Sequence, residues 1–328
     1  MKLARYAAGL VLLAALFYFR LIDLDELRKA FGHPGLLTLT WLLCMLTIPV
    51  AALRWHILLR SQGLELHLWH TMRIVAIGAF FSTFLPGSAG GDLVRGVYIY
   101  QASHGRRTSA LLSIFIDRLI GLTAFVVFGV AATLTRPAAS YGIFEYSIFA
   151  FAALFALGIV VLFVFGHRIA QLVNRLFAGR SQKIAAIIDD AGAALHQYSR
   201  QWPSVLLCFA ISLFVVLTIA VTVVVIADAT EFGGLSAVEY GIAGVYAMIA
   251  NSLPFTPGGI GIGEGAFASA CVALEPTVTG IPYGTIFLVL RCVIVLSTLP
   301  GLVVYLLYPQ RARLLAAAKA DPSGDLVA

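Results

Sequence analysis

The sequence predicts an all-α polytopic membrane protein with about six transmembrane helices and two re-entrant helical hairpins arranged as an inverted repeat. Three observations lead to this fold class. Hydrophobic residues form 60% of the 328 positions and charged residues only 12%, against about 25% charged residues in soluble domains. Apolar runs of about 20 residues, the length that crosses a bilayer, recur along the chain. Two glycine-rich and proline-rich stretches with carboxylates, 85–95 and 253–264, interrupt such runs in the two halves.

The apolar runs define six predicted crossings. They cover about residues 6–22, 36–58, 109–134, 146–165, 205–227 and 283–308. Two further segments, a hairpin at 69–100 and another at 240–275, are apolar enough to enter the membrane, but glycines and prolines stop each of them. Irregular backbone inside a bilayer is tolerated only where protein encloses it or where it lines a cavity, so each hairpin tip is a predicted functional site. The chain, 1–328, is expected to form a single integral membrane domain.

Basic residues set the predicted orientation. The formal net charge of +6 lies mainly in connecting segments, which the positive-inside rule places in the cytoplasm. These segments include an amphipathic connection at 167–203, a tail at 309–328 and the RWHILLR run, where Arg54, Trp55 and Arg60 are expected at the membrane interface. We therefore expect a multi-pass protein of a bacterial-type cytoplasmic (inner) membrane, with both termini cytoplasmic and the first apolar run kept as an uncleaved helix.

This topology makes the two hairpins equivalent. Residues 36–134 form a first half that runs into the cytoplasm, through a hairpin and back out, and residues 204–308 form a second half with every direction reversed. The spacing agrees, because 26 residues separate Asp92 from Arg118 and 27 separate Glu264 from Arg291. Inverted halves with broken helices are typical of secondary transporters.

The hairpin tips carry the chemistry of an anion site. Glycine lets backbone N–H groups approach a ligand, and a helix that begins at the tip adds about half a positive charge. Arg118 and Arg291, aided by Arg95, are the predicted phosphate-binding residues, because a guanidinium matches phosphate oxygens with two hydrogen bonds. The carboxylates expected to neutralise these arginines in the empty site are Asp92, Asp117 and Glu264, one of which alternatively carries a coupling proton.

Smaller candidates belong to the same tips. They are Gly87, Ser88, Gly90, Gly91, Asn251, Thr256, Gly258, Gly259 and Gly261. The competing interpretation is structural, since glycines also form interhelical turns and tight crossings, and amides and hydroxyls cap helices. Asp117 and Arg118 can likewise form a local ion pair, but helix neighbours point about 100° apart, so each is expected to find another partner. Arg291 lies between apolar residues and therefore requires a buried partner.

Other functional classes lack their motifs. The four cysteines lie in apolar stretches without CxxC or other metal-ligand spacing, and no pair of histidines compels a metal site. The patterns GxxxxGK[ST], HExxH and GxSxG are absent. No basic run with interleaved aromatic residues points to nucleic acid. We therefore expect no cofactor, no metal and no nucleic-acid partner, and we expect that the protein is not an enzyme.

At LPGSAGGDLVR, IDRLIG and LPFTPGGIGIGEGAF, over about residues 5–310, the sequence resembles a flippase-like membrane family related to the transmembrane region of lysylphosphatidylglycerol synthases. The matching residues are Pro86, Gly91, Asp92, Arg95, Asp117, Arg118, Pro257, Gly258, Gly259, Gly261 and Glu264. The resemblance implies movement of a lipid between leaflets, with aminoacylated phosphatidylglycerol, other phospholipids or polyprenyl-phosphate-linked sugars as cargo. The chain departs from the synthases by lacking their soluble aminoacyl-transfer domain, so lipid synthesis is not expected.

Residues and resemblance together favour a lipid flippase or lipid transporter that moves an anionic phospholipid or polyprenyl-phosphate-linked lipid by alternating access. Its expected partners are membrane lipids with anionic headgroups. Two alternatives remain open. One is a non-transporting membrane partner that scaffolds, or presents lipid to, a lipid-modifying enzyme such as a synthase or glycosyltransferase. The other is a small-solute or ion secondary transporter, which predicts a closed polar cavity without a lateral opening to lipid.

Overall fold

The chain is helical wherever the structure describes regular elements. The computed structural model describes residues 32–84, 89–103, 106–162, 182–230, 234–252, 256, 259–277 and 281–307. These residues form ten α-helices and a short 3-10 helix, Ala138–Ser140. The predicted all-α class is confirmed. The predicted crossing 6–22, the tail 309–328 and residues 167–181 of the predicted connection lie outside the described residues.

Five helices are long and apolar enough to cross a membrane. They are α3 (Pro34–Ser61), α6 (Arg107–Leu134), α7 (Ile143–Val160), α10 (Trp202–Ala229) and α13 (Gly284–Leu307). Each coincides with a predicted crossing, so the multi-pass class is confirmed. The first turns of α3 and α10 contain a proline, whose fixed φ suits the start of a helix and whose missing N–H costs no hydrogen bond there.

Four shorter helices occupy the predicted hairpins. They are α4 (Leu68–Phe84), α5 (Ala89–Ala102), α11 (Ala237–Asn251) and α12 (Ile262–Leu274). With 13 to 17 residues, they are about 20–26 Å long, less than the roughly 30 Å of a bilayer core. The tenth helix, α9 (Gln182–Arg200), lies within the predicted amphipathic connection. A re-entrant course of the two helix pairs through a bilayer stays a prediction.

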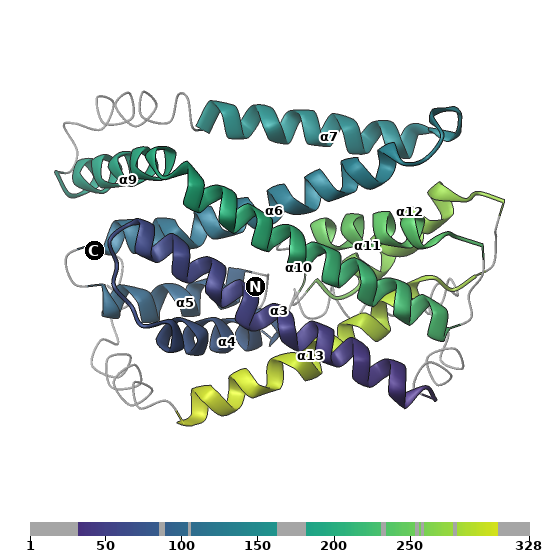
Figure 1. The fold of residues 1–328 in the computed structure, drawn as a ribbon, viewed down its shortest axis with the longest axis horizontal. Helices are drawn as coiled ribbons and strands as arrows, with labels where there is room; N and C mark the ends of the chain where they lie inside the picture. Colours follow the sequence, from purple (N-terminus) through teal and green to yellow (C-terminus); the bar gives the residue numbers. More distant parts are fainter. Residues whose placement is uncertain are drawn as a thin grey trace.

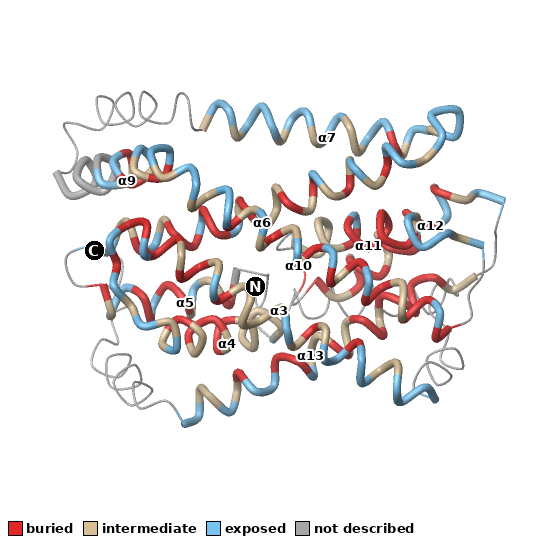
Figure 2. Tube along the Cα trace, in the orientation of Figure 1, coloured by how far each residue is buried: buried red, intermediate tan, exposed pale blue. Residues whose placement is uncertain are grey.

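The short helices lie in two opposite halves of the bundle. Figure 1 shows α4 and α5 at one end and α11 and α12 at the other, with α3 and α10 crossing between them. Two hydrophobic cores follow this division. One gathers buried residues of α3, α4, α5 and α6, and the other gathers buried residues mainly of α10, α11, α12 and α13. Helix α7 lies at the periphery and is mostly exposed (Figure 2).

The helix contacts repeat from one half to the other. In the first half α3 packs on α4, α4 on α5, α5 on α6 and α3 on α6. The corresponding pairs of the second half, α10 with α11, α11 with α12, α12 with α13 and α10 with α13, are also in contact. Between the halves α3 packs on α10, α4 on α13 and α11 on α6. Exchanging the two sets of four helices leaves this pattern unchanged.

Glycines permit the closest helix contacts. A Cβ on Gly91 of α5 would lie 2.1 Å from the carbonyl oxygen of Gly78 on α4, and a Cβ on Gly78 would lie 2.7 Å from Cγ of Arg95. A Cβ on Gly91 would also lie 1.9 Å from Oγ of Ser82, so the later α4 residue faces the earlier α5 residue and the two helices are antiparallel. Gly91 therefore permits a tight helix crossing, which is the structural alternative to a role in ligand binding.

A glycine also permits a close contact between the halves, where α4 packs on α13. A Cβ on Gly301 would lie 2.0 Å from the carbonyl oxygen of Ala76, and backbone cannot move aside as a flexible side chain can. We expect Gly301→Ala to lower the free energy of unfolding by about 1–3 kcal/mol, the usual cost of overpacking. The matched control is Gly158→Ala on α7, where nothing lies within 4 Å of the added Cβ. Unfolding in detergent measures both, and equal stabilities would contradict the close packing at Gly301.

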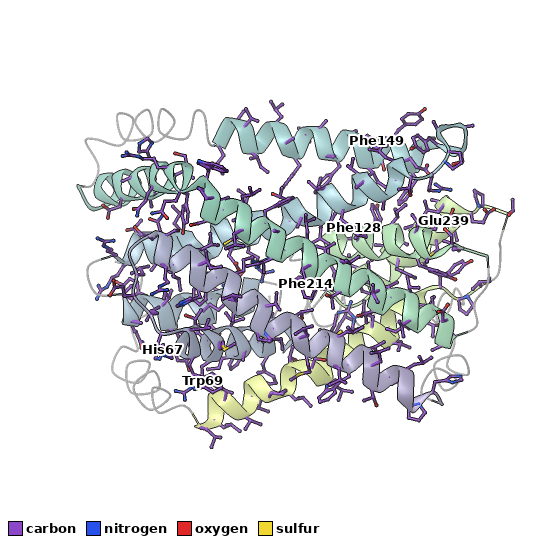
Figure 3. The ribbon with its side chains drawn as sticks, viewed as in Figure 1. His67, Trp69, Phe128, Phe149, Phe214 and Glu239 are labelled. Carbon is purple, nitrogen blue, oxygen red and sulfur yellow. The ribbon has the colours of Figure 1, made fainter. Side chains whose placement is uncertain are left out.

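One partly buried arginine contacts four helices at one end of the bundle. Arg136, just beyond α6, pairs with Glu145 on α7 and lies 3.2 Å from Glu239 on α11. It also donates to the carbonyl oxygen of Leu274 on α12, at 3.0 Å. Figure 3 shows Glu239 near this end, whereas His67 and Trp69 lie at the opposite end. No motif in the sequence predicted this cluster.

Candidate functional site

One short helix of each pair, α4 in the first half and α11 in the second, ends beside one cavity of about 360 Å³. Its described lining comes from α3, α4, α6, α10, α11 and α13, which belong to both halves. Ser82 and Thr83 line it from the last turn of α4, and Asn251 lines it from the last residue of α11. Arg118 reaches it from α6 and Arg291 from α13. The broken helices thus leave their ends where two arginines converge.

The second half contributes a compact ion pair. Glu264, in the first turn of α12, is fully buried and accepts from Nε of Arg291 and, at 3.0 Å, from its Nη2. The same Nη2 donates to Oδ1 of Asn251 and to the carbonyl oxygen of Gly259, each at 3.0 Å. Arg291 therefore ties the end of α11 to the start of α12.

The backbone before α12 requires glycine. Gly259 and Gly261 have φ of +72° and +84°, a region that residues with a Cβ rarely adopt. A Cβ on Gly259 would also lie 1.8 Å from Oδ1 of Asn251. The turn is closed by the N–H of Gly261, which donates to Glu264 at 2.9 Å, and by the hydroxyl of Thr256, which donates to the carbonyl oxygen of Ile260 at 2.9 Å.

The first half contributes a longer network of charges. Arg118 donates through Nε to Asp92 in the first turn of α5, at 2.6 Å, and Arg95 approaches the same carboxylate at 3.4 Å. Arg95 also donates to Oδ2 of Asp117, at 3.1 Å. Arg54 of α3 donates to Oδ1 of Asp117, at 2.8 Å, and its Nη1 donates to Ser212 of α10, at 2.8 Å. One chain of ion pairs therefore joins α3, α5 and α6.

The two clusters together hold four arginines and three carboxylates. With every group ionised, the charge near the cavity is therefore +1. Buried charges require partners, because their Born cost is high, and each of these carboxylates has at least one arginine. Arg118 is the most exposed of these four arginines, with 45% of its side chain accessible. The cavity thus presents guanidinium groups and an excess positive charge.

The chain matches the model of one known protein family. The family described as "Lysylphosphatidylglycerol synthase TM region" matches residues 3–304, which is most of the chain. The chain belongs to this family. The membership confirms the resemblance indicated by the motifs, and the name of the lysylphosphatidylglycerol synthase TM family links it to lipid modification. No curated protein and no solved structure matches the chain significantly.

In this member of the lysylphosphatidylglycerol synthase TM family, the predicted site residues separate into three groups. Arg118, Asn251 and Arg291 line the cavity. Asp92, Gly259 and Glu264 bond directly to these arginines, and Arg95, Asp117, Thr256 and Gly261 belong to the hydrogen-bond networks around them, whereas Gly90 and Gly91 lie in the first turn of α5, where Gly91 packs against α4. Gly87, Ser88 and Gly258 lie outside the described residues. A role in binding stays a prediction for all of them.

The prediction of an interfacial Arg54 and Trp55 is wrong. Trp55 is 0% exposed and its indole N–H donates to Ser113 at 3.0 Å, while the Arg54 side chain is 11% exposed and paired with Asp117. Helix α3 continues to Ser61, seven residues past Arg54, so Arg54 lies about 10 Å inside the helix end. The signal for this pair was Asp117 itself, because a carboxylate in a crossing requires a buried cation.

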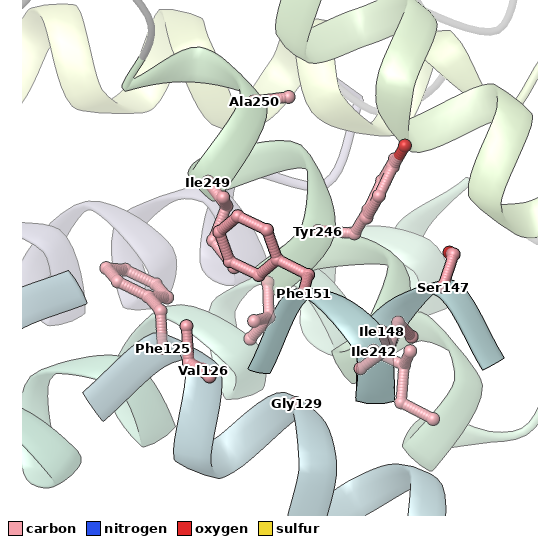
Figure 4. Close-up of a pocket in the computed structure, with 11 residues that line it drawn as sticks. Phe125, Val126, Gly129, Ser147, Ile148, Phe151, Ile242, Tyr246, Ile249 and Ala250 are labelled. Atoms are coloured by element: carbon pink, nitrogen blue, oxygen red, sulfur yellow. The ribbon is translucent and has the colours of Figure 1, made fainter. Parts of the chain in front are cut away.

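A second cavity, of about 320 Å³, has a different character. It lies between α6, α7 and α11, and Figure 4 shows its side chains, nearly all aliphatic or aromatic. Phe125, Phe151, Ile249 and Tyr246 are among them. The same last turn of α11 that brings Asn251 to the polar cavity brings Ile249 and Ala250 to this apolar one. Polar and apolar surfaces therefore adjoin at the end of α11.

Proposed function

We propose that the protein moves a lipid with an anionic phosphate headgroup between the two leaflets of a membrane, by alternating exposure of the central cavity. The observation that carries the proposal is that Arg118 and Arg291, from α6 and α13, line the same cavity. Guanidinium groups match phosphate oxygens in geometry and charge. Two of them from opposite halves fit one headgroup held between those halves.

The charge balance of the clusters supports an anionic ligand. Arg118 and Arg291 each pair with a carboxylate, so the empty cavity does not hold bare cations. The excess of one positive charge is nevertheless unfavourable inside a membrane. A phosphodiester monoanion in the cavity neutralises it.

The helix contacts support the transport mechanism. Two sets of four helices with interchangeable contacts are expected of an inverted repeat, in which broken helices meet near the membrane midplane and one half rocks against the other. Helices α4, α5, α11 and α12 are too short to cross a bilayer and are the re-entrant elements of this proposal. The adjoining apolar cavity at α11 (Figure 4) suits the hydrocarbon chain of a lipid more than it suits a soluble ion.

The distribution of charge supports the orientation. Arg60, Arg107 and Arg200, in the terminal turns of α3, α6 and α9, and Arg106, between α5 and α6, lie at one end of the bundle. The connections at the opposite end carry the carboxylates Glu239 and Glu275 around Arg136. By the positive-inside rule the first set lies in the cytoplasm, which gives cytoplasmic termini in a bacterial-type inner membrane. We assign transport rather than catalysis, because the carboxylates of the clusters are engaged by arginines.

Arg118→Ala tests the proposal. Tail-labelled phosphatidylglycerol is reconstituted with the purified protein in liposomes, with and without an imposed pH gradient, and the outer leaflet is bleached chemically. We expect the variant to move the lipid at least about tenfold more slowly, a factor that corresponds to the free energy of one hydrogen bond to a charged group. Its stability should change little, because a half-exposed ion pair contributes about 0–1 kcal/mol.

Arg107→Ala is the matched control. Arg107 is an exposed arginine that donates to the hydroxyl of Tyr100 at 3.0 Å and does not line the cavity. The Arg107→Ala variant should move phosphatidylglycerol at the wild-type rate. Wild-type transport by Arg118→Ala would refute the headgroup site. Absence of transport by the wild-type protein, together with co-purification of a lipid-modifying enzyme, would favour the scaffold alternative.

A further inference from the structure

The lining of the central cavity is rich in hydroxyl groups. Thr47 lines the cavity from α3, Ser82 and Thr83 from α4, and Ser297 and Thr298 from α13. The remaining described lining is apolar apart from Arg118, Asn251 and Arg291. Five hydroxyl residues from three helices therefore stand around a site whose cationic part is already defined. Phosphate binding does not require them, so they point to the rest of the headgroup.

Four of these hydroxyl groups donate their protons to backbone carbonyls, which leaves their oxygens available as acceptors. Thr47 donates its proton to the carbonyl oxygen of Cys44 at 2.7 Å, and Thr298 donates to that of Val295 at 2.8 Å. Ser297 and Thr83 bond in the same way to backbone carbonyls of their own helices, at 2.8 and 3.2 Å. A hydroxyl oxygen that has donated its proton still has lone pairs to accept hydrogen bonds. The lining thus suits a ligand that carries hydrogen-bond donors.

Charge decides which donors fit. The described lining of the cavity contains two arginines and no carboxylate, and Asp92 and Glu264 are paired with those arginines. An added ammonium group would lie near an excess positive charge without a counter-ion of its own, which is costly inside a membrane. Uncharged hydroxyl donors carry no such cost. A volume of about 360 Å³ is at the low end for a ligand pocket, about 300–1,000 Å³, and suits a headgroup alone.

We propose that the cavity selects a phosphodiester monoanion whose headgroup carries uncharged hydroxyl groups, and that it discriminates against headgroups that carry an ammonium. This inference rests on the proposed function and specifies its substrate class. The same chemistry occurs in a glycerol headgroup on a phospholipid and in a sugar on a polyprenyl phosphate. The two sources are separate arms of the test.

The test compares lipids that differ in one feature. Tail-labelled phosphatidylglycerol, phosphatidylpropanol, lysylphosphatidylglycerol and a glucosyl polyprenyl phosphate are measured in parallel in proteoliposomes. Phosphatidylpropanol keeps the monoanion but has no hydroxyl, and the lysyl lipid adds ammonium groups. We expect the wild-type protein to move at least one hydroxylated monoanion about fivefold or more faster than phosphatidylpropanol, the value of one hydrogen bond. The lysyl lipid should move more slowly still.

Substitutions of the hydroxyl residues that line the cavity test whether these residues cause the selectivity. Thr47→Val with Thr298→Val removes two acceptors and keeps the shape of the side chains, so it should lower the ratio of the phosphatidylglycerol rate to the phosphatidylpropanol rate to about one. Thr218→Val is the matched control, because Thr218 of α10 makes the same kind of backbone bond, at 2.8 Å, away from the cavity lining. It should keep the preference.

Two outcomes would overturn the inference. One is equal rates for phosphatidylglycerol, the glucosyl lipid and phosphatidylpropanol, and the other is transport of the lysyl lipid as fast as phosphatidylglycerol. A failure of the proposed function is distinct, because then no lipid moves at all. In that case the selectivity is tested by measuring the binding of short-chain phosphatidylglycerol and phosphatidylpropanol to the protein in detergent. Tighter binding of phosphatidylglycerol would support the proposed selectivity, and equal affinities would refute it.

Discussion

Arg291→Ala should destabilise the protein more than any other single change in the second half. Glu264 is fully buried, and Arg291 is its only cationic partner among the described residues. Removing one member of a buried ion pair leaves the other uncompensated, which costs about 3–5 kcal/mol. We expect a correspondingly lower midpoint of unfolding in detergent, together with loss of lipid transport.

A neutral pair separates folding from function. In Glu264→Gln with Arg291→Gln neither side chain is charged, and buried pairs replaced together are often nearly neutral in stability. We expect this double variant to regain most of the stability lost in Arg291→Ala but none of the transport, because the cavity then lacks one guanidinium. Wild-type transport by the double variant would show that Arg291 has a purely structural role.

Much of the fold could be predicted from the sequence because hydropathy in a membrane protein is a strong signal. The five crossings that fall on described residues were located to within a few residues, since about 20 apolar residues must lie together to cross a bilayer. The short helices were located by Pro86 and the adjacent glycines and by the PGGIG run, which cannot continue a lipid-facing helix. The separate partners of Asp117 and Arg118, and the buried partner of Arg291, were also confirmed.

The position of Arg54 could not be predicted in the same way. The RWHILLR run has the composition of a membrane interface, and composition does not indicate how far a helix continues beyond it. Only the packing of α3 against α6 and α10 brings Arg54 to Asp117 and Ser212. The cluster at Arg136 was missed for a similar reason, because Glu145 and Glu239 are distant in sequence and look like ordinary loop charges. Pairing between distant loops depends on tertiary structure.

The network around Asp117 should be as important for stability as Glu264, with a different consequence for transport. Both carboxylate oxygens of Asp117 accept from arginines, Arg54 at 2.8 Å and Arg95 at 3.1 Å. Without Asp117, Arg54 loses its carboxylate partner, and Arg95 keeps Asp92 at 3.4 Å and a cation–π contact with Trp55, whose ring centre lies 4.2 Å from the guanidinium carbon. We expect Asp117→Asn to lower the free energy of unfolding by about 3–5 kcal/mol, measured by denaturation in detergent.

Restoring the charge balance should restore the fold. Arg54→Gln with Asp117→Asn returns the first network to its original net charge, so the double variant should be more stable than Asp117→Asn alone. A double-mutant cycle would then give a coupling energy above about 1 kcal/mol, as expected for residues in one ion-pair network. Additive losses would contradict the network. Since neither residue lines the cavity, the double variant should also transport lipid, whereas the neutral pair at Glu264 and Arg291 should not. This contrast distinguishes arginines that hold the helices in place from arginines that face the headgroup.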